Sequence, residues 1–545
     1  MSESRETDSG RIRVADITIA QLSRGLYRST ATALKELVNN AWDADATEVR
    51  IDTNSPEFDI ISCVDNGKGM SLDEFRRFFK EEGVGSCTKR KHQRDRTDIY
   101  HRPIIGRLGI GMLAIGQLCH SFQMESHYID DQGARRAYRA NIVLTDVDIA
   151  DKEVVIRDDD LATREVDVGR WKFEEMEYQE ARQGFRIFSD DVRPTFRREM
   201  RDSISRKAAK GLSFRLSDLH SNFYGKAEKS IRDCKAYLET IWELCVLCPV
   251  PYYDGLDEFP VDIKLFSSLE RSSEEFRRAR AVIRRRQERL LAYTFRVVFD
   301  GIELKRHIQL PTDRKTIPKL YVMQFDDEVF DARLSLEGYL FAQIPTAIRP
   351  FELSGVQIRV RNVGIGGYDS TFLRYSERIE TIKSRWVSGE LFVDEGLESA
   401  LNIDRDSFNE HDEHYKKLQS LLHQRLPKVF NEIDRIATER RRDIGTGKDE
   451  AIDLAWQGMV KKHSRGVLKL VSREMGQDAP VVSFEEKSRT LVLNTSVRPI
   501  GRQAGDRAVR AALIAYHAAK QTVEADEQKD AMFEQLLREM LRYKP

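Results

Sequence analysis

The chain has 545 residues, and its 89 lysines and arginines nearly balance its 90 aspartates and glutamates. This balance excludes a global charge that would drive the protein onto nucleic acid or a membrane surface. No apolar run approaches the roughly 18 residues of a membrane span. The six cysteines lack the spacing of a disulfide framework. We therefore expect a cytoplasmic protein of about three domains with no membrane contact.

The first expected elements are a disordered lead over residues 1–12 and, from residue 13 to 250, an alternation of helices and strands typical of an α/β sandwich. The run 36–46 predicts a helix with an apolar stripe on one face. Glu36, Asn40 and Asp43 fall at i, i+4 and i+7, so they share another face. Such a face is suited to lining a metal-nucleotide pocket, although a solvated polar face is the simpler interpretation of this triplet alone.

A short apolar run at residues 60–64 predicts a buried strand, and it leads directly into Asp65, Gly67 and Gly69. An aspartate at a strand end can accept a hydrogen bond, while the glycines let the backbone approach a flat ligand. Residues 71–74 form a capping box, which predicts the start of a helix. The polar stretch 90–101 has no hydrophobic period and is typical of a mobile loop.

A second glycine segment follows, with Gly106, Gly109 and Gly111 opening into an apolar helix. Backbone N–H groups in such a turn, together with a helix N-terminus, can receive phosphate. The spacing matches neither the Rossmann fingerprint nor the Walker loop. Each glycine cluster alone fits an ordinary turn as well as it fits a phosphate cradle.

The order of these four features over residues 36–114 resembles the GHKL ATPase superfamily. That superfamily includes the DNA gyrase B subunit, the 90-kDa heat-shock chaperones, sensor histidine kinases and MutL. The resemblance implies a Bergerat-type α+β sandwich that binds ATP with Mg²⁺ and hydrolyses the ATP. It implies that Glu36 is the general base, that Asn40 binds Mg²⁺ and that Asp65 accepts the adenine amino hydrogen bond.

The other residues that the resemblance places around the nucleotide belong to the motifs or to a closing lid. They are Asp43, Gly67, Gly69, Met70, Ser86, Thr88, Lys89, Gly106, Gly109 and Gly111. The last motif of the family is a Gly-Thr pair on a strand. Residues 211–216 are the best candidate and residues 184–187 the second choice, but neither has the threonine, so both stay outside the expected site.

The turn-rich stretch 249–255 predicts a domain boundary, followed by a second α/β domain at residues 256–442. Strict alternation over residues 356–363 predicts a half-exposed strand. Residues 355–426 resemble the middle domain of the 90-kDa heat-shock chaperones. That resemblance implies that Arg405 reaches the γ-phosphate from this domain as a second catalytic residue.

Three further features leave more than one interpretation open. The seven arginines of residues 277–289 favour a solvated helix face over a nucleic-acid contact, because aromatic residues are not interleaved with them. Cys245 and Cys248 lie in an apolar run, which favours buried core over a metal site. Residues 443–449 predict a linker to a small C-terminal α/β domain at 450–545, in which residues 490–494 predict a strand. The helices of this domain over residues 506–542 either make a homodimer, which we expect, or close the domain's own core.

Together, the two resemblances imply an ATP-gated conformational clamp that acts on protein clients. The alternative is a nucleic-acid-associated ATPase clamp of the MORC or MutL type, with a role in genome defence. Only the arginine-rich segment supports that alternative in the sequence.

Overall fold

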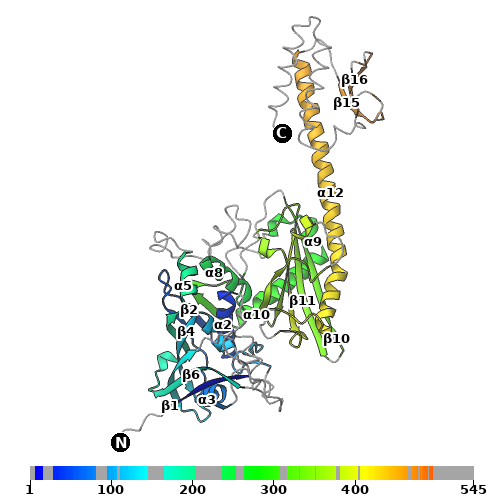
Figure 1. Cartoon of the computed structure of the whole chain (residues 1–545). Helices are drawn as coiled ribbons and strands as arrows, with labels where there is room; N and C mark the ends of the chain where they lie inside the picture. Colours follow the sequence, from blue (N-terminus) through cyan, green and yellow to red (C-terminus); the bar gives the residue numbers. More distant parts are fainter. Residues whose placement is uncertain are drawn as a thin grey trace, which may run out of the picture. The chain divides into compact units, whose positions relative to one another are not determined.

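The structure is a computed structural model of the whole chain, shown in Figure 1. It describes residues 7–15, 29–81, 95–106, 111–144, 165–202, 236–252, 263–306, 316–330, 332–349, 351–375, 381–402, 406–463, 469–476, 479, 482–485, 487–488 and 490–494. The chain divides into two compact units, Met1–Ile433 and Asp434–Pro545. Both contain helices and mixed sheets, so the predicted α/β fold class is confirmed.

A nine-stranded sheet forms the first half of unit 1, in the order β1-β6-β5-β4-β7-β3-β2-β8-β9. Every neighbouring pair is antiparallel except β2 and β8. The strands are β1 (Thr7–Ala15), β2 (Glu48–Asp52), β3 (Ile61–Asp65), β4 (Cys119–Ile129), β5 (Arg135–Leu144), β6 (Glu165–Met176), β7 (Gly184–Val192), β8 (Arg296–Phe299) and β9 (Ile302–Glu303).

The helical elements of this half confirm two local predictions. The capping box is present at Ser71, whose hydroxyl accepts from the Glu74 N–H while the Glu74 carboxylate accepts from the Ser71 N–H. The predicted helix at Glu36 lies within α2 and packs against η2 and α8. These elements are α2 (Thr30–Asp43), α3 (Leu72–Arg76), η1 (Arg77–Glu81), η2 (Gly111–Gln117), η4 (Glu180–Arg182), α5 (Pro194–Asp202) and α8 (Ala236–Leu247).

A five-stranded sheet forms the second half of unit 1, in the order β10-β11-β14-β12-β13, with only β12 and β14 parallel. Helix α10 packs on β10 and β11. The strands are β10 (Ile317–Val329), β11 (Ala332–Ile344), β12 (Gly355–Val360), β13 (Val363–Asp369) and β14 (Val387–Glu395). The helical elements are η6 (Ile263–Leu265), α9 (Ser268–Ser272), α10 (Glu274–Ala292), η7 (Phe351–Leu353), α11 (Thr381–Ser384) and the start of α12 (Glu413–His463), whose residues from Asp434 onward belong to unit 2.

Unit 2 holds a three-stranded sheet in the order β15-β17-β16. Its strands are β15 (Lys469–Arg473), β16 (Val482–Glu485) and β17 (Thr490–Asn494), and β17 confirms the strand predicted there. The C-terminal helices predicted over residues 506–542 lie outside the described residues. Among the described helices, none combines the length and the apolar character needed to cross a membrane.

Several predicted boundaries differ from those in the structure. Residues 7–12 are not a disordered lead, because β1 pairs with β6 along its whole length. This pairing stabilises a strand whose own composition is polar. The first sheet does not end near residue 250, since β8 and β9 extend it. Residues 443–449 are not a linker but part of the continuous helix α12.

The prediction of a half-exposed strand at residues 356–363 is wrong. All of β12 is buried, and the strand ends at a turn in which Arg361 and Asn362 have φ of 51° and 73°. The polar side chains of β12 are paired inside the protein, where they need partners. The Arg359 guanidinium contacts the Glu390 carboxylate at 2.5 Å, and both side chains are fully buried. Alternation in the sequence therefore reflects two buried faces of different polarity.

Candidate functional site

Helix α2 carries the first group of predicted site residues. Its N-cap is Ser29, whose hydroxyl oxygen accepts from the Thr32 N–H at 3.3 Å and donates to Glu243 of α8 at 2.7 Å. The Glu36 side chain is buried and accepts a hydrogen bond from the Asn39 amide at 3.3 Å. Asn40 is half-buried. Asn39 was not predicted in the site, and its contact with Glu36 orients the Glu36 carboxylate.

Asp65 stands at the end of β3, as predicted, opposite Phe185 of β7. Its carboxylate accepts from the Gly67 N–H at 2.8 Å. Burial raises the pKa of Asp65 to about 7, although hydrogen bonds from the backbone of Gly67 and Phe185 oppose that shift. A carboxylate held in this way can accept one further N–H from a bound base.

The two glycines after Asp65 are required by close packing. A Cβ on Gly67 would stand 2.6 Å from the Ala44 carbonyl oxygen, at the end of α2. Gly69 has a φ of 76°, and a Cβ there would stand 2.8 Å from the His127 carbonyl oxygen. Met70 is fixed to Ser126, whose hydroxyl bonds both the N–H and the carbonyl of Met70. The loop of residues 65–70 is thus held between α2 and β4.

The C-terminal end of α2 also holds residues 95–106, which we name the anchored segment. Asp43 accepts from the N–H groups of Ile105 and Gly106 at 2.7 and 2.5 Å. The Trp42 indole N–H donates to the Pro103 carbonyl at 2.9 Å. Asp45 accepts from two further N–H groups near the start of the segment. The prediction of a mobile loop is therefore wrong for residues 95–101.

These contacts change the expected roles of two residues. Asp43 and Gly106 were both expected to contact the nucleotide, yet they bond to each other. The Gly106 N–H is engaged by a carboxylate, so it is not free to receive a phosphate oxygen in this state. In this structure Asp43 holds the start of the glycine segment through its two hydrogen bonds.

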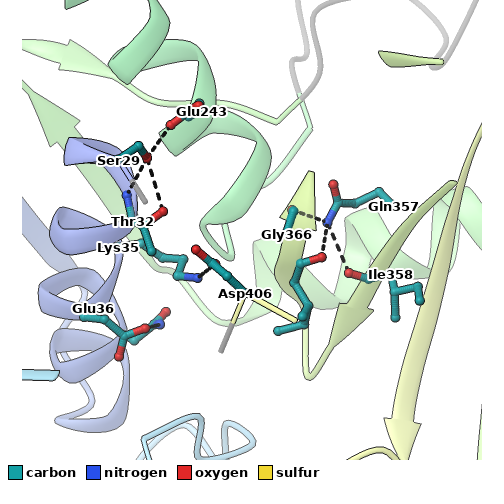
Figure 2. Close-up of polar contacts among 11 residues, drawn as sticks. Ser29, Thr32, Lys35, Glu36, Glu243, Gln357, Ile358, Gly366 and Asp406 are labelled. Atoms are coloured by element: carbon teal, nitrogen blue, oxygen red, sulfur yellow. Dashed lines mark hydrogen bonds and ion pairs between the residues drawn. The ribbon is translucent and has the colours of Figure 1, made fainter. Parts of the chain in front are cut away.

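The segment between β14 and α12 reaches α2 through a buried ion pair, shown in Figure 2. The Lys35 ammonium lies 2.8 Å from the Asp406 carboxylate, with 0% and 7% of the two side chains exposed. Lys35 precedes Glu36 in the chain, and Asp406 follows Arg405. The sequence holds no local signal for this pair, because 371 residues separate its members.

Several predicted site residues lie outside the described residues. They are Ser86, Thr88, Lys89, Gly109 and Arg405, together with the 211–216 candidate for the last motif. Gly111 is described as the first residue of η2. The second-choice candidate, residues 184–187, lies in β7 beside Asp65, where a Cβ on Gly184 would come within 2.1 Å of the Asp65 carbonyl oxygen. The Phe185 backbone N–H donates there to the Asp65 carboxylate.

The donor set fits a nucleotide with Mg²⁺. Asp65 offers an acceptor for an amino group, and the crowding at Gly67 and Gly69 shows how closely backbone surrounds that position. Among the described residues, no three carboxylates, imidazoles or thiols gather as a metal site. Mg²⁺ commonly takes only one or two protein oxygens and the rest from phosphate and water, and the Asn40 carboxamide offers an oxygen of that kind.

Two other features singled out in the sequence have structural roles. Cys245 and Cys248 are buried in the core at α8, which confirms the core interpretation. In α10, the buried Arg286 forms two hydrogen bonds to Asp394 at 2.7 and 3.0 Å, and Arg285 bonds Glu337 at 2.7 Å. These arginines attach α10 to the five-stranded sheet.

Comparison with known proteins bears on this site. Residues 27–160 match the family model described as "Histidine kinase-, DNA gyrase B-, and HSP90-like ATPase". A Herpetosiphon aurantiacus protein that is provisionally named the type II restriction enzyme HgiDII is 41% identical over 98 residues. That match covers 18% of this chain and only 15% of the relative's length. Residues 27–160 thus form an ATPase domain of the GHKL type, as the motifs predict.

Proposed function

We propose that the protein binds ATP with Mg²⁺ at the site formed by α2, the loop of residues 65–70 and the glycine segment that begins at Gly106, and that it hydrolyses the ATP. The observation that carries this proposal is the buried Glu36 carboxylate, which the Asn39 carboxamide orients. Glu36 lies on α2, the helix that anchors both loops. Phosphoryl transfer depends on positioning and charge stabilisation, which this arrangement supplies.

The residues have distinct roles in this proposal. Glu36 accepts a proton from the attacking water, and Asn39 keeps its carboxylate in place. Asp65 accepts the adenine amino hydrogen bond. Asn40 binds Mg²⁺, which supplies charge neutralisation at the phosphates when bound. Arg405 contacts the γ-phosphate; it precedes Asp406, which is tied to α2 beside Glu36.

The test compares Glu36→Gln with Asn40→Ala. Glu36→Gln keeps the shape of the side chain but removes the base, so we expect ATP binding to persist while turnover falls by about 100-fold or more. Asn40→Ala should weaken Mg²⁺-dependent binding. Glu180→Gln, at an exposed carboxylate paired with Arg135, is the control and should change neither ATP turnover nor ATP binding. Wild-type turnover in Glu36→Gln would contradict the assignment.

For the work that hydrolysis drives, we propose an action on nucleic acid. The name of the Herpetosiphon relative supports this partner class. A basic surface pocket of about 380 Å³ adds a physical basis, because Arg271, Arg277 and Arg280 line it with Ser268 and Ser272. Guanidinium and hydroxyl groups together suit phosphate oxygens. The competing function, a clamp on protein clients, is supported by the likeness of residues 355–426 to a chaperone middle domain.

One comparison separates these two functions. ATP hydrolysis is measured with DNA and with an unfolded protein over a range of salt concentrations. We expect stimulation by DNA that weakens steeply with salt, and a smaller stimulation in Arg271→Ala/Arg277→Ala. Arg333→Ala, at an exposed arginine paired with Asp326, is the control. Stimulation by unfolded protein alone would favour the client clamp. The homodimer also remains a proposal, which the mass of the protein in solution would test.

A further inference from the structure

We propose that Arg361, in the turn between β12 and β13, is a positioning residue for the nucleotide site and acts through the peptide bond between Ile104 and Ile105. The inference rests on the proposed ATP site and extends it. The site residues expected from the sequence do not include this arginine, and it lies outside the matched residues 27–160.

Arg361 connects the five-stranded sheet to the anchored segment. Its Nη1 group donates to the Ile104 carbonyl oxygen at 2.6 Å, although 257 residues separate the two positions. The other side of the guanidinium is fixed within its own half of the unit, where Nε and Nη2 lie 3.0 and 2.8 Å from the Glu398 carboxylate. Nη2 also lies 3.6 Å from Asp95, near the start of the segment. The Arg361 side chain is buried, so water has little access to its contacts with Ile104 and Glu398, whereas the Asp95 side chain is 79% exposed.

The same peptide bond is held from its opposite side by α2. Its carbonyl oxygen accepts from Arg361, and its N–H, which belongs to Ile105, donates to Asp43 at 2.7 Å. Because a peptide unit is planar, contacts at both its oxygen and its nitrogen fix the orientation of the plane. The next N–H, at Gly106, also donates to Asp43. Arg361 and Asp43 together therefore set the direction in which the glycine segment begins.

The backbone at Arg361 adds a second argument. Arg361 and Asn362 have φ of 51° and 73°, as a two-residue turn with both central residues in the left-handed region requires. Glycine, asparagine and aspartate are the favoured residues in such a turn, and an arginine there is strained. Strain of this kind is retained where the side chain does something that the favoured residues cannot do. The long, forked side chain of arginine reaches Ile104 and Glu398 at once.

A separate contact makes the role of Arg361 testable. The buried Lys35–Asp406 ion pair also ties the region after β14 to α2, next to Glu36 rather than at the glycine segment. If Arg361 loses its contacts, this pair still joins the two halves of unit 1. We therefore expect a substitution at Arg361 to change the geometry of the glycine segment without separating the two sheets.

The experiment compares Arg361→Met with wild type. Methionine keeps the apolar stem but makes no hydrogen bond, so amide exchange at Ile105 and Gly106 should accelerate by about tenfold or more in the nucleotide-free protein. Affinity for ATP should fall by a similar factor, because phosphate contacts depend on the glycine segment. Affinity for adenosine should stay unchanged, because Asp65 binds the adenine. A general loss of folding would instead lower the affinities for ATP and for adenosine alike.

Two further variants complete the design. Arg361→Lys should restore part of the ATP affinity, since an ammonium can reach one partner but cannot replace the fork; it also serves if Arg361→Met fails to fold. Arg374→Met, at an exposed arginine 2.7 Å from Glu410 in the same half of unit 1, is the control. Unchanged exchange at Ile105 and Gly106, or an unchanged ratio of ATP to adenosine affinity, would overturn the proposal. If wild type binds neither ligand, the proposed function fails, and the amide exchange still decides the role of Arg361.

Discussion

Asp65 shows how burial at one residue connects the fold to pH. Its carboxyl has a pKa of about 7 because desolvation disfavours the charged form. The neutral acid has only one good acceptor oxygen, while the carboxylate accepts hydrogen bonds at both. An adenine amino group therefore prefers the ionised form. Below about pH 7, a proton must leave Asp65 when the base binds.

We accordingly predict that adenine binding strengthens as the pH rises through about 7. The folded pKa lies above the ordinary value of 3.8, so the site holds a proton between these two values and must release it on binding. Adenosine is the appropriate ligand, because its lack of phosphate removes a second titrating group. Calorimetry in buffers of different ionisation enthalpy would measure the proton release. Asp65→Asn should abolish the pH dependence, and a flat profile in wild type would contradict the prediction.

At the level of residues, the sequence predicts the local motifs and misses the long-range contacts. Glu36 and Asp65 lie where periodicity and strand ends put them, since their neighbours in the chain determine their positions. The partners of Lys35 and Arg361 lie 371 and 257 residues away. No local pattern encodes such a pairing. The contacts of Asp43 could not be predicted for the same reason, because its partners are backbone N–H groups, which have no signature in the sequence.

At the level of elements, the anchored segment depends on α2 and on one buried arginine. Arg102 is completely buried and donates to the carbonyl oxygens of Ala46 and Tyr293 at 2.6 Å and of Trp42 at 3.3 Å. Its guanidinium also lies over three aromatic rings, those of Trp42, Tyr100 and Phe295. Desolvation lowers the pKa of Arg102, while the nearby Asp45 carboxylate opposes this shift.

We predict that Arg102→Met destabilises the protein strongly. The substitution preserves most of the side-chain volume but removes three charge-assisted hydrogen bonds to backbone carbonyl oxygens, each worth about 1.5–3 kcal/mol. A total decrease of roughly 3–5 kcal/mol in the free energy of unfolding should follow, measured by urea denaturation of unit 1. Arg135→Met, which removes an exposed pair with Glu180, should cost less than about 1 kcal/mol. Equal effects of the two substitutions would contradict the proposed role of Arg102.

The elements themselves were predicted best where periodicity and capping agree. The strand at residues 61–65, the helix that begins after Ser71 and β17 all follow from short patterns. The β12–β13 turn was missed because Arg361 continues the alternation of β12 and no glycine marks the turn, although the adjacent polar residue Asn362 breaks the pattern. The polar edge strand β1 was missed because pairing with β6, and not its own composition, stabilises it.

At the level of the whole molecule, the two halves of unit 1 are more closely joined than the sequence predicts. The chain after residue 250 returns to the first sheet, where β8 pairs in parallel with β2. Just before β8, Tyr293 and Phe295 pack edge-on against Trp42 of α2, with ring centroids 5.1 and 5.2 Å apart. Helix α2 therefore packs part of its apolar face against the region that was predicted to be a separate domain. Turn-rich residues mark a bend in the chain, but they do not show which sheet the chain joins next.

This arrangement predicts the behaviour of fragments. A fragment of residues 1–252 ends at the predicted boundary and lacks β8, so β2 becomes an unpaired edge and Trp42 loses two aromatic partners. Arg102 also loses the Tyr293 carbonyl. We expect this fragment to melt at a lower temperature than residues 1–433, to be cleaved faster by protease and to lose adenosine binding. Residues 1–433 should match the full chain in melting temperature, in resistance to protease and in adenosine binding. Cooperative melting of the shorter fragment at the temperature of the longer one would show that the ATPase domain is complete without β8.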